Sequence, residues 1–215
     1  MNLSDLSEAF QRRFEETTTA REKALAAGRR SIRASANAIR AIHRGELEQA
    51  HRLMDESRSA IQAGREAVRE AHPGVYFAGH LQDAQKEYAE ARLTEAIVAG
   101  SDLPSPEDLE VELPPYLNGM AETIGEGRRA ILDLLRRGEV AESERILSAM
   151  EEMHYLLVSM DFPDAITGNL RRSTDVARSI IERTRGDLSV TLVQRNLQEA
   201  LEQHARLLRD PSGGG

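Results

Sequence analysis

Two pairs of glutamates with helical spacing are the residues of this sequence best suited to chemistry. Glu87 and Glu90 are three residues apart in a stretch, 80–92, that lacks Gly and Pro and is rich in helix-forming residues. Glu122 and Glu126 are four residues apart in a second expected helix. Residues at these spacings share one helix face, so each pair should present two aligned carboxylates. Two such helices packed together can hold a hard divalent cation.

The spacing alone favours a solvated acidic face over a metal site. The surroundings of the second pair favour a more specific role, because small residues are interleaved with it: Gly119, Ala121, Thr123, Gly125 and Gly127. A mid-helix Gly costs roughly 1 kcal/mol relative to Ala, and a solvated face has no use for it. Small residues let another backbone or a ligand approach closely. We therefore expect either a metal site or a tight interface around Glu122 and Glu126.

Composition sets the class of protein in which these acids must be placed. The chain has 215 residues, of which 40% are hydrophobic, 30% charged and only 4% aromatic, which favours a helical bundle over a β-sandwich or barrel. It has no Cys, which excludes disulfides, thiolate metal sites and cysteine nucleophiles. The six His residues show no zinc-like spacing. No apolar run resembles a signal peptide or a membrane span, so we expect a cytoplasmic protein.

The hydrophobic pattern predicts six long helices in a single domain, residues 1–210, followed by a disordered tail, 211–215. The expected helices are 3–42, 47–71, 75 or 80 to 99, 116–137, 140–160 and 170–209. Between them, 100–115 is the one long irregular stretch, because Pro residues interrupt it. Phe10 and Phe14, spaced by four in the first helix, should lie in the core.

Two of the predicted connections resemble each other. Residues 44–50 and 137–143 both place Arg-Gly-Glu at the end of a helix, and we expect Gly45 and Gly138 to supply the left-handed residue of a helix C-cap. The sequence therefore predicts two similar helical hairpins within one bundle. Two copies do not support a solenoid.

The length of the last helix predicts self-association. Forty residues span roughly 60 Å, whereas a compact domain of this size has a radius of gyration of about 17 Å. The helix should therefore overhang a single bundle, with Gly186 as a possible bend. Its apolar residues would form a patch larger than monomers usually expose, and they are Ile180, Ile181, Leu188, Leu197, Leu201, Leu207 and Leu208.

Four strings of the sequence together resemble the translin and TRAX family, in particular its archaeal members. Residues 162–178 (FPDAITGNLRRSTDVAR) and 182–188 (ERTRGDL) are similar to family segments. Lys86–Ala91 is similar to the TRAX motif Gln-Glu-Tyr-Val-Glu-Ala. Ala121–Glu126 aligns with the TRAX motif Ala-Asp-Leu-Thr-Gly-Glu. The resemblance covers almost the whole chain.

This resemblance implies an all-α bundle of about seven helices that assembles into closed octamers around RNA or single-stranded DNA. TRAX-type subunits are Mg²⁺-dependent endoribonucleases, whereas translin-type subunits bind nucleic acid without the complete set of acids. Glu87, Glu90 and Glu126 match the TRAX glutamates. Glu122 stands where TRAX has Asp, which moves the carboxylate outward by one methylene, and Mg²⁺ is strict about geometry. Because all four acids are present, the catalytic type is expected.

We therefore predict an endoribonuclease that cleaves single-stranded RNA inside a homo-octamer and uses Mg²⁺ or Mn²⁺ held by these four catalytic glutamates. The net charge of −8 is compatible with an anionic ligand if the cations face the lumen of the shell. The candidate RNA-binding residues are Arg12, Arg13, Arg29, Arg30 and Arg33. Two alternatives remain: a non-catalytic assembly that binds single-stranded nucleic acid, and an oligomeric scaffold that binds none.

Overall fold

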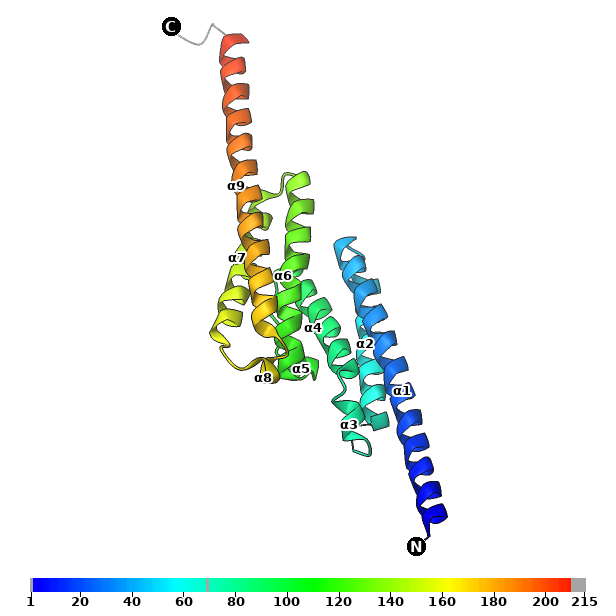
Figure 1. Ribbon diagram of the computed structural model, residues 1–215. Helices are drawn as coiled ribbons and strands as arrows, with labels where there is room; N and C mark the ends of the chain where they lie inside the picture. The colour runs from blue at the N-terminus through cyan, green and yellow to red at the C-terminus, as the bar shows by residue number, and fades with distance from the viewer. Residues whose placement is uncertain (1, 69, 210–215) are drawn as a thin grey trace.

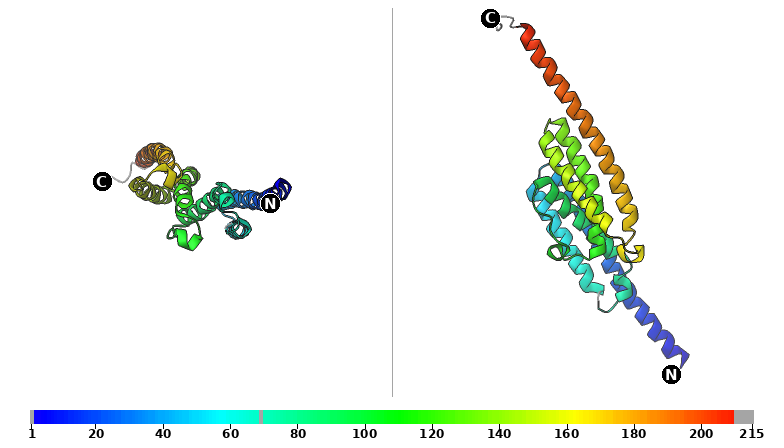
Figure 2. Two further views of the ribbon diagram at one scale, coloured as in Figure 1. Left: turned by 60° about the horizontal axis from the view of Figure 1, so that its bottom comes forward. Right: turned by 90° about the vertical axis from the view of Figure 1, so that its left-hand side faces the viewer.

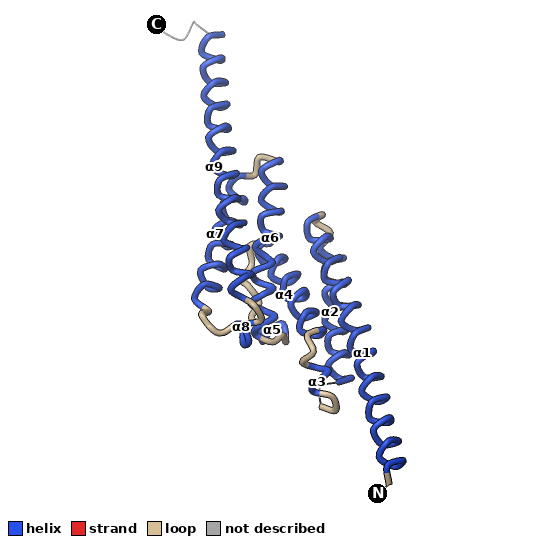
Figure 3. Tube along the Cα trace, viewed as in Figure 1, coloured by secondary structure: helices blue, strands red, loops and turns tan. Residues whose placement is uncertain are grey.

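Helices make up nearly all of the part of the chain that the structure describes. The computed structural model describes residues 2–68 and 70–209; the tail predicted to be disordered lies outside these residues. Three one-turn helices lie in the connections: α3 (Pro73–Tyr76), α5 (Pro106–Leu109) and α8 (Asp164–Thr167) (Figures 1 and 3). The long helices are α1 (Leu3–His43), α2 (Leu47–Val68), α4 (His80–Ala99), α6 (Leu113–Arg136), α7 (Val140–Ser159) and α9 (Leu170–Arg209). The predicted all-α class is confirmed.

Helix α4 lies at the centre of the arrangement. On one side it packs against the α1–α2 hairpin, and on the other against α6, which in turn packs against α7 and α9. The end-on view in Figure 2 shows this order as a curved row of helices. Both faces of α4 are therefore covered, and its sequence carries buried residues all around, including Tyr88, Leu93 and Gln85. The central position of α4 brings residues of α1 and α6 to the same helix.

The two helical hairpins have the predicted turns. Gly45, between α1 and α2, has φ +74°, and Gly138, between α6 and α7, has φ +79°. A side chain is strained in this left-handed region, which explains why Gly stands at both positions. The amide of Glu46 donates to the Ala41 carbonyl, and that of Glu139 donates to the Leu134 carbonyl, so both turns close the preceding helix in the same way.

The start of α6 corrects the sequence prediction. Leu113, Pro114 and Pro115 belong to its first turn, although their prolines predict an irregular stretch. Prolines are tolerated there because the first amides of a helix have no acceptor within the helix. The stretch 100–115, expected to be irregular, also contains α5, which is capped by Ser105 and Asp108.

The first part of α1 and the last part of α9 project from opposite ends of the bundle (Figure 1). No residue described before Ala20 in α1 is buried, and neither is any residue of α9 after Leu188 whose burial is described, 189–206. The prediction that Phe10 and Phe14 lie in the core is wrong: they are 55% and 74% exposed, because α1 extends beyond its neighbours. The predicted overhang of α9 is confirmed, and it runs as one helix through Gly186. The side chains of Leu207 and Leu208 lie outside the described part.

None of the described helices combines the length and apolar composition needed to span a lipid bilayer.

Candidate metal centre

The backbones of α4 and α6 meet at Gly119. A Cβ atom at this position would lie 2.7 Å from the Lys86 carbonyl oxygen and 3.1 Å from the Glu90 amide nitrogen, both in α4. Thr123, one turn further along α6, donates from Oγ1 to the carbonyl of Gly119 at 2.9 Å. The close approach predicted from the small residues is thus present at Gly119. Gly125 has only Ile180 near its Cβ position, at 3.9 Å, so it does not serve the same purpose.

Three of the predicted acids come together across this contact. Glu87 and Glu90 from α4 and Glu122 from α6 each offer one carboxylate oxygen, and these three atoms lie within 4.8 Å of one another. Glu90 is buried, with 8% of its surface exposed, whereas Glu87 is half-buried and Glu122 is exposed. The cluster therefore has a closed inner side at Glu90 and an open outer side at Glu122.

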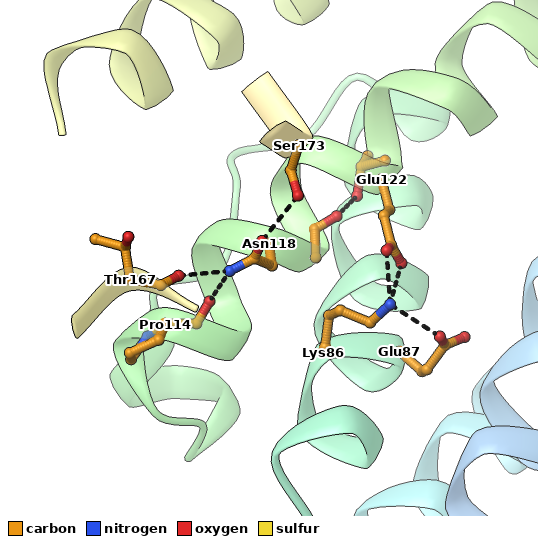
Figure 4. Close-up of polar contacts among 9 residues, drawn as sticks. Lys86, Glu87, Pro114, Asn118, Glu122, Thr167 and Ser173 are labelled. Atoms are coloured by element: carbon orange, nitrogen blue, oxygen red, sulfur yellow. Dashed lines mark hydrogen bonds and ion pairs between the residues drawn. The ribbon is translucent and has the colours of Figure 1, made fainter. Parts of the chain in front are cut away.

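A lysine ammonium lies in this cluster. Lys86 Nζ donates to both oxygens of Glu122, at 2.6 and 2.7 Å, and lies 3.3 Å from Glu87 Oε1 (Figure 4). Burial by itself lowers the pKa of Lys86, but the bond to Glu122 and the charges of both glutamates outweigh burial, so its pKa is raised. Lys86 therefore carries a full positive charge at neutral pH. No motif or spacing in the sequence pointed to Lys86, although it precedes Glu87 and is one of only two lysines in the chain.

Glu90 has the most perturbed acidity in the cluster. Burial, followed by repulsion from Glu122 and Glu87, raises the pKa of Glu90 to about 8. Its carboxyl group is therefore largely protonated at neutral pH when only protein groups surround it. A cation at this position would reverse the balance, because a nearby positive charge favours the carboxylate.

Glu126 has different partners from the other three acids. Its Oε2 accepts from His43 Nε2 at 2.5 Å, and Arg129 Nη1 lies 3.6 Å away. The hydrogen bond from His43 is the main reason that the pKa of Glu126 is lowered. Glu126 is not part of the group that meets within 4.8 Å, so its role as a fourth ligand stays a prediction. His43 lies 83 residues away in the sequence, and no spacing rule could have linked it to Glu126.

A second polar network holds α6 in place beside the site. Asn118 donates from Nδ2 to the carbonyls of Pro114 and Thr167, at 3.0 and 2.8 Å, and accepts from Ser173 Oγ at 2.9 Å (Figure 4). These bonds tie α6 to α8 and to the start of α9. The segment that carries the strongest family resemblance, 162–178, therefore stabilises the helix that presents Glu122.

The predicted RNA-binding arginines lie along α1. All five are exposed. Arg12 and Arg13 belong to the projecting part of the helix, whereas Arg29, Arg30 and Arg33 lie where α1 packs on its neighbours. Arg30 Nε donates to Glu56 Oε1 of α2 at 2.8 Å, so one of the candidate cations is already paired.

The donor set of the cluster fits a hard divalent cation. Carboxylate oxygens are the ligands that Mg²⁺ and Mn²⁺ prefer, and no sulfur or imidazole ligand competes within the group. The position of Lys86 shows that the site already accommodates a cation, since its ammonium binds two of the three acids. The carboxylate oxygens that could hold such an ion are reached from the open side, next to Glu122.

Comparison with known proteins places these features in context. No family model matches the chain. It is 29% identical over 187 residues to an uncharacterized protein of Methanocaldococcus jannaschii. The aligned residues cover 85% of this chain and 81% of that protein. It is 34% identical to AfC3PO in a crystal structure, with a TM-score of 0.80 and coverage of 87% of this chain and 97% of that one.

Two further solved structures are similar. AfC3PO in a complex with duplex RNA is 33% identical, with a TM-score of 0.77, and covers 87% of this chain and 97% of that one. Apo-NeC3PO is 20% identical, with a TM-score of 0.72, and the match covers 88% of this chain and 97% of that one. At that identity the similarity concerns the fold alone.

Proposed function

Because the chain belongs to the translin/C3PO family, we propose that it binds RNA and cleaves it as a metal-dependent endoribonuclease of the TRAX-like type. The observation that carries this proposal is the meeting of Glu87, Glu90 and Glu122 between α4 and α6. The solved complex of AfC3PO with duplex RNA supports RNA as the ligand.

In the proposed site, Glu87, Glu90 and Glu122 hold Mg²⁺ or Mn²⁺, and Glu126 completes the set of acids one turn further along α6. When bound there, such a cation would activate a water and neutralise charge on the phosphodiester. The protein contributes the positions of the ligands: Gly119 brings the backbones of α4 and α6 together, and His43 holds the Glu126 carboxylate from α1. The buried side at Glu90 limits the approach of substrate to the open side.

The proposal includes assembly into a closed homo-oligomer, with an octamer as the expected form. The projecting ends of α1 and α9 support it, because their exposed apolar side chains need a partner surface. An oligomer with closed symmetry would bury these side chains against neighbouring subunits without forming filaments. In such a shell the arginines of α1 can face enclosed RNA, while the net charge of −8 is carried mainly by other surfaces.

A cleavage assay tests the proposal directly. Metal-free protein is incubated with a labelled single-stranded RNA, or with the corresponding duplex, in EDTA, Mg²⁺ or Mn²⁺. We expect cleavage with either metal and none in EDTA. Glu122→Gln, which removes the charge of one ligand and keeps its size, should abolish the metal-dependent products. Equal cleavage by the parent protein in EDTA and Mg²⁺ would contradict the metal-dependent mechanism.

A non-catalytic RNA-binding assembly is the second candidate, and one observation favours it. Lys86 already neutralises Glu122 and approaches Glu87, as in a structural ion-pair network. In that case RNA binding should persist with intact RNA under every metal condition. The third possibility, a scaffold that binds no nucleic acid, predicts no salt-dependent RNA binding at all.

A further inference from the structure

The bonds of Lys86 bear on how a metal ion can enter the cluster. Both oxygens of Glu122 are bonded to the Lys86 ammonium, and Glu87 lies within ion-pair distance of the same nitrogen. Of the three acids that meet across the helix contact, only Glu90 is not in ion-pair contact with Lys86. The positive charge of Lys86 therefore occupies the side of the site from which a metal ion would approach.

A divalent cation and this ammonium compete for the oxygens of Glu122. Mg²⁺ binds carboxylate oxygens at about 2.1 Å. An ion bound to either oxygen of Glu122 would therefore lie less than about 5 Å from Lys86 Nζ in its present position. At that separation, like charges in a half-buried site repel strongly. This repulsion favours a position of Lys86 away from Glu122 when a metal ion binds there.

The contacts of Lys86 allow its side chain to take another position. Its side chain is only partly buried, and the ammonium is held by side chains alone, because all of its ion-pair partners are glutamates. The four-carbon stem has several rotatable bonds, and its ammonium is a point charge that accepts many donor geometries. On the open side, a phosphodiester oxygen of bound RNA is the natural new acceptor for the released ammonium.

We propose that Lys86 is a built-in competitor of the divalent cation, and that RNA binding relieves this competition by offering a phosphate to the ammonium. The inference rests on the proposed function, since it concerns the same carboxylate site. Metal and RNA should then bind cooperatively, because each ligand favours the state in which Lys86 has left Glu122. Such coupling is reciprocal: RNA tightens metal binding by the same factor as metal tightens RNA binding. The protein would hold its metal firmly only when substrate is present.

The first test measures Mn²⁺ affinity without RNA, by calorimetry on the full-length protein. Lys86→Gln should bind Mn²⁺ about tenfold more tightly, since it removes a charge-assisted hydrogen bond with which the metal must compete. Lys86→Met, which keeps the length of the apolar stem, should show the same gain and serves if the Gln variant does not fold. Far-UV circular dichroism checks the fold of each variant.

Two controls separate competition from a general change in charge. Arg129→Gln removes one positive charge beside Glu126 but none from the three-carboxylate cluster. Lys23→Gln removes the only other lysine, which lies exposed on α1. We expect a gain of less than about twofold from Arg129→Gln and none from Lys23→Gln.

The second test repeats the titration with a saturating 2′-O-methyl single strand, checked afterwards to be intact. Adding the strand should increase the Mn²⁺ affinity of the parent protein several-fold. The increase for Lys86→Gln should be much smaller. If Lys86→Gln gains no more affinity than Arg129→Gln, or if both proteins respond equally to the strand, the inference is wrong. The proposed function would survive that result, provided that the parent protein binds Mn²⁺ and cleaves RNA. If neither protein binds Mn²⁺ saturably, the metal site and the inference fail together.

Discussion

Two regions of the molecule differ in where their side chains find partners. One is the contact between α4 and α6, and the other is the pair of projecting ends of α1 and α9. At the contact, Gly119 meets the α4 backbone, and the acids there are buried, paired with Lys86 or bonded to His43. At the ends, apolar side chains such as Phe14 and Leu197 remain exposed. The chemical site is thus assembled within one chain, whereas the ends require a partner surface. Substitutions in the two regions should accordingly affect different properties.

The largest expected effect lies at the contact. Glu126→Ala should reduce RNA cleavage by at least about 100-fold, because it removes one acid of the proposed metal set. RNA affinity should stay equal or rise, since one repulsive charge near phosphate is removed. Gel-based cleavage and binding assays measure the two quantities. Asp133→Ala, two turns further along α6, is the matched control and should cleave like the parent protein. Parent-like cleavage by Glu126→Ala would exclude Glu126 from the catalytic set.

The projecting ends should control assembly and leave the folding of the subunit unchanged. Light scattering on the parent protein should give a multiple of the 23.9 kDa chain mass, with eight subunits expected. Replacing Val193 and Leu197 by Ser should lower this mass, because both are exposed apolar residues of the α9 overhang. Replacing the neighbouring Gln194 and Gln198 by Ser should not. A parent mass near that of one chain would contradict the closed shell.

The pH dependence of the free energy of unfolding should distinguish the environment of Glu90 from that of Glu126. Burial raises the pKa of Glu90 to about 8 from an ordinary value of 4.5. Above pH 4.5 the unfolded chain loses this proton while the folded one retains it, so the parent protein loses stability until about pH 8. Glu90→Gln should therefore be more stable by an amount that grows between pH 4.5 and 8 and reaches on the order of 5 kcal/mol.

Glu126 should show the opposite sign. Its pKa is lowered by the bond from His43, so its stabilisation is present above pH 4.5 and is lost as the pH falls through its folded pKa. Glu126→Gln should cost about 1 kcal/mol at pH 7 and less in acid. Urea unfolding in EDTA at one fixed protein concentration measures both variants. The same sign for the two variants would show that the acids share one environment.

The smallest expected effect concerns the arginines of α1. Neutralising Arg29, Arg30 and Arg33 to Gln should weaken RNA binding and flatten its dependence on salt. The logarithmic slope should fall by about 0.7 for each phosphate of a single strand that the protein no longer neutralises. Arg30 should contribute least, because it is bonded to Glu56. Neutralising Arg12 and Arg13 instead tests the projecting part of the same helix. An unchanged slope in both variants would assign these cations to the outer surface.

Local sequence features are sufficient to predict most of the helices and turns of the fold. Propensity and periodicity predicted the long helices, and Gly45 and Gly138 marked the two hairpin turns, because the left-handed conformation favours Gly whatever the surroundings. The same rules erred where long-range packing decides. Phe10 and Phe14 have core-like spacing but extend past their neighbours, and Pro114 and Pro115 could join α6 because they stand in its first turn.

For the candidate site, the sequence by itself determined the acids and their faces, since Glu87 and Glu90, like Glu122 and Glu126, are aligned by helix geometry alone. Only the tertiary structure decided which acids meet. It brought Glu122 to the α4 pair through the close approach at Gly119 and left Glu126 beside His43, 83 residues away. It also placed the Lys86 ammonium on Glu122. Contacts between helices far apart in sequence depend on how whole helices pack, and no local spacing encodes that.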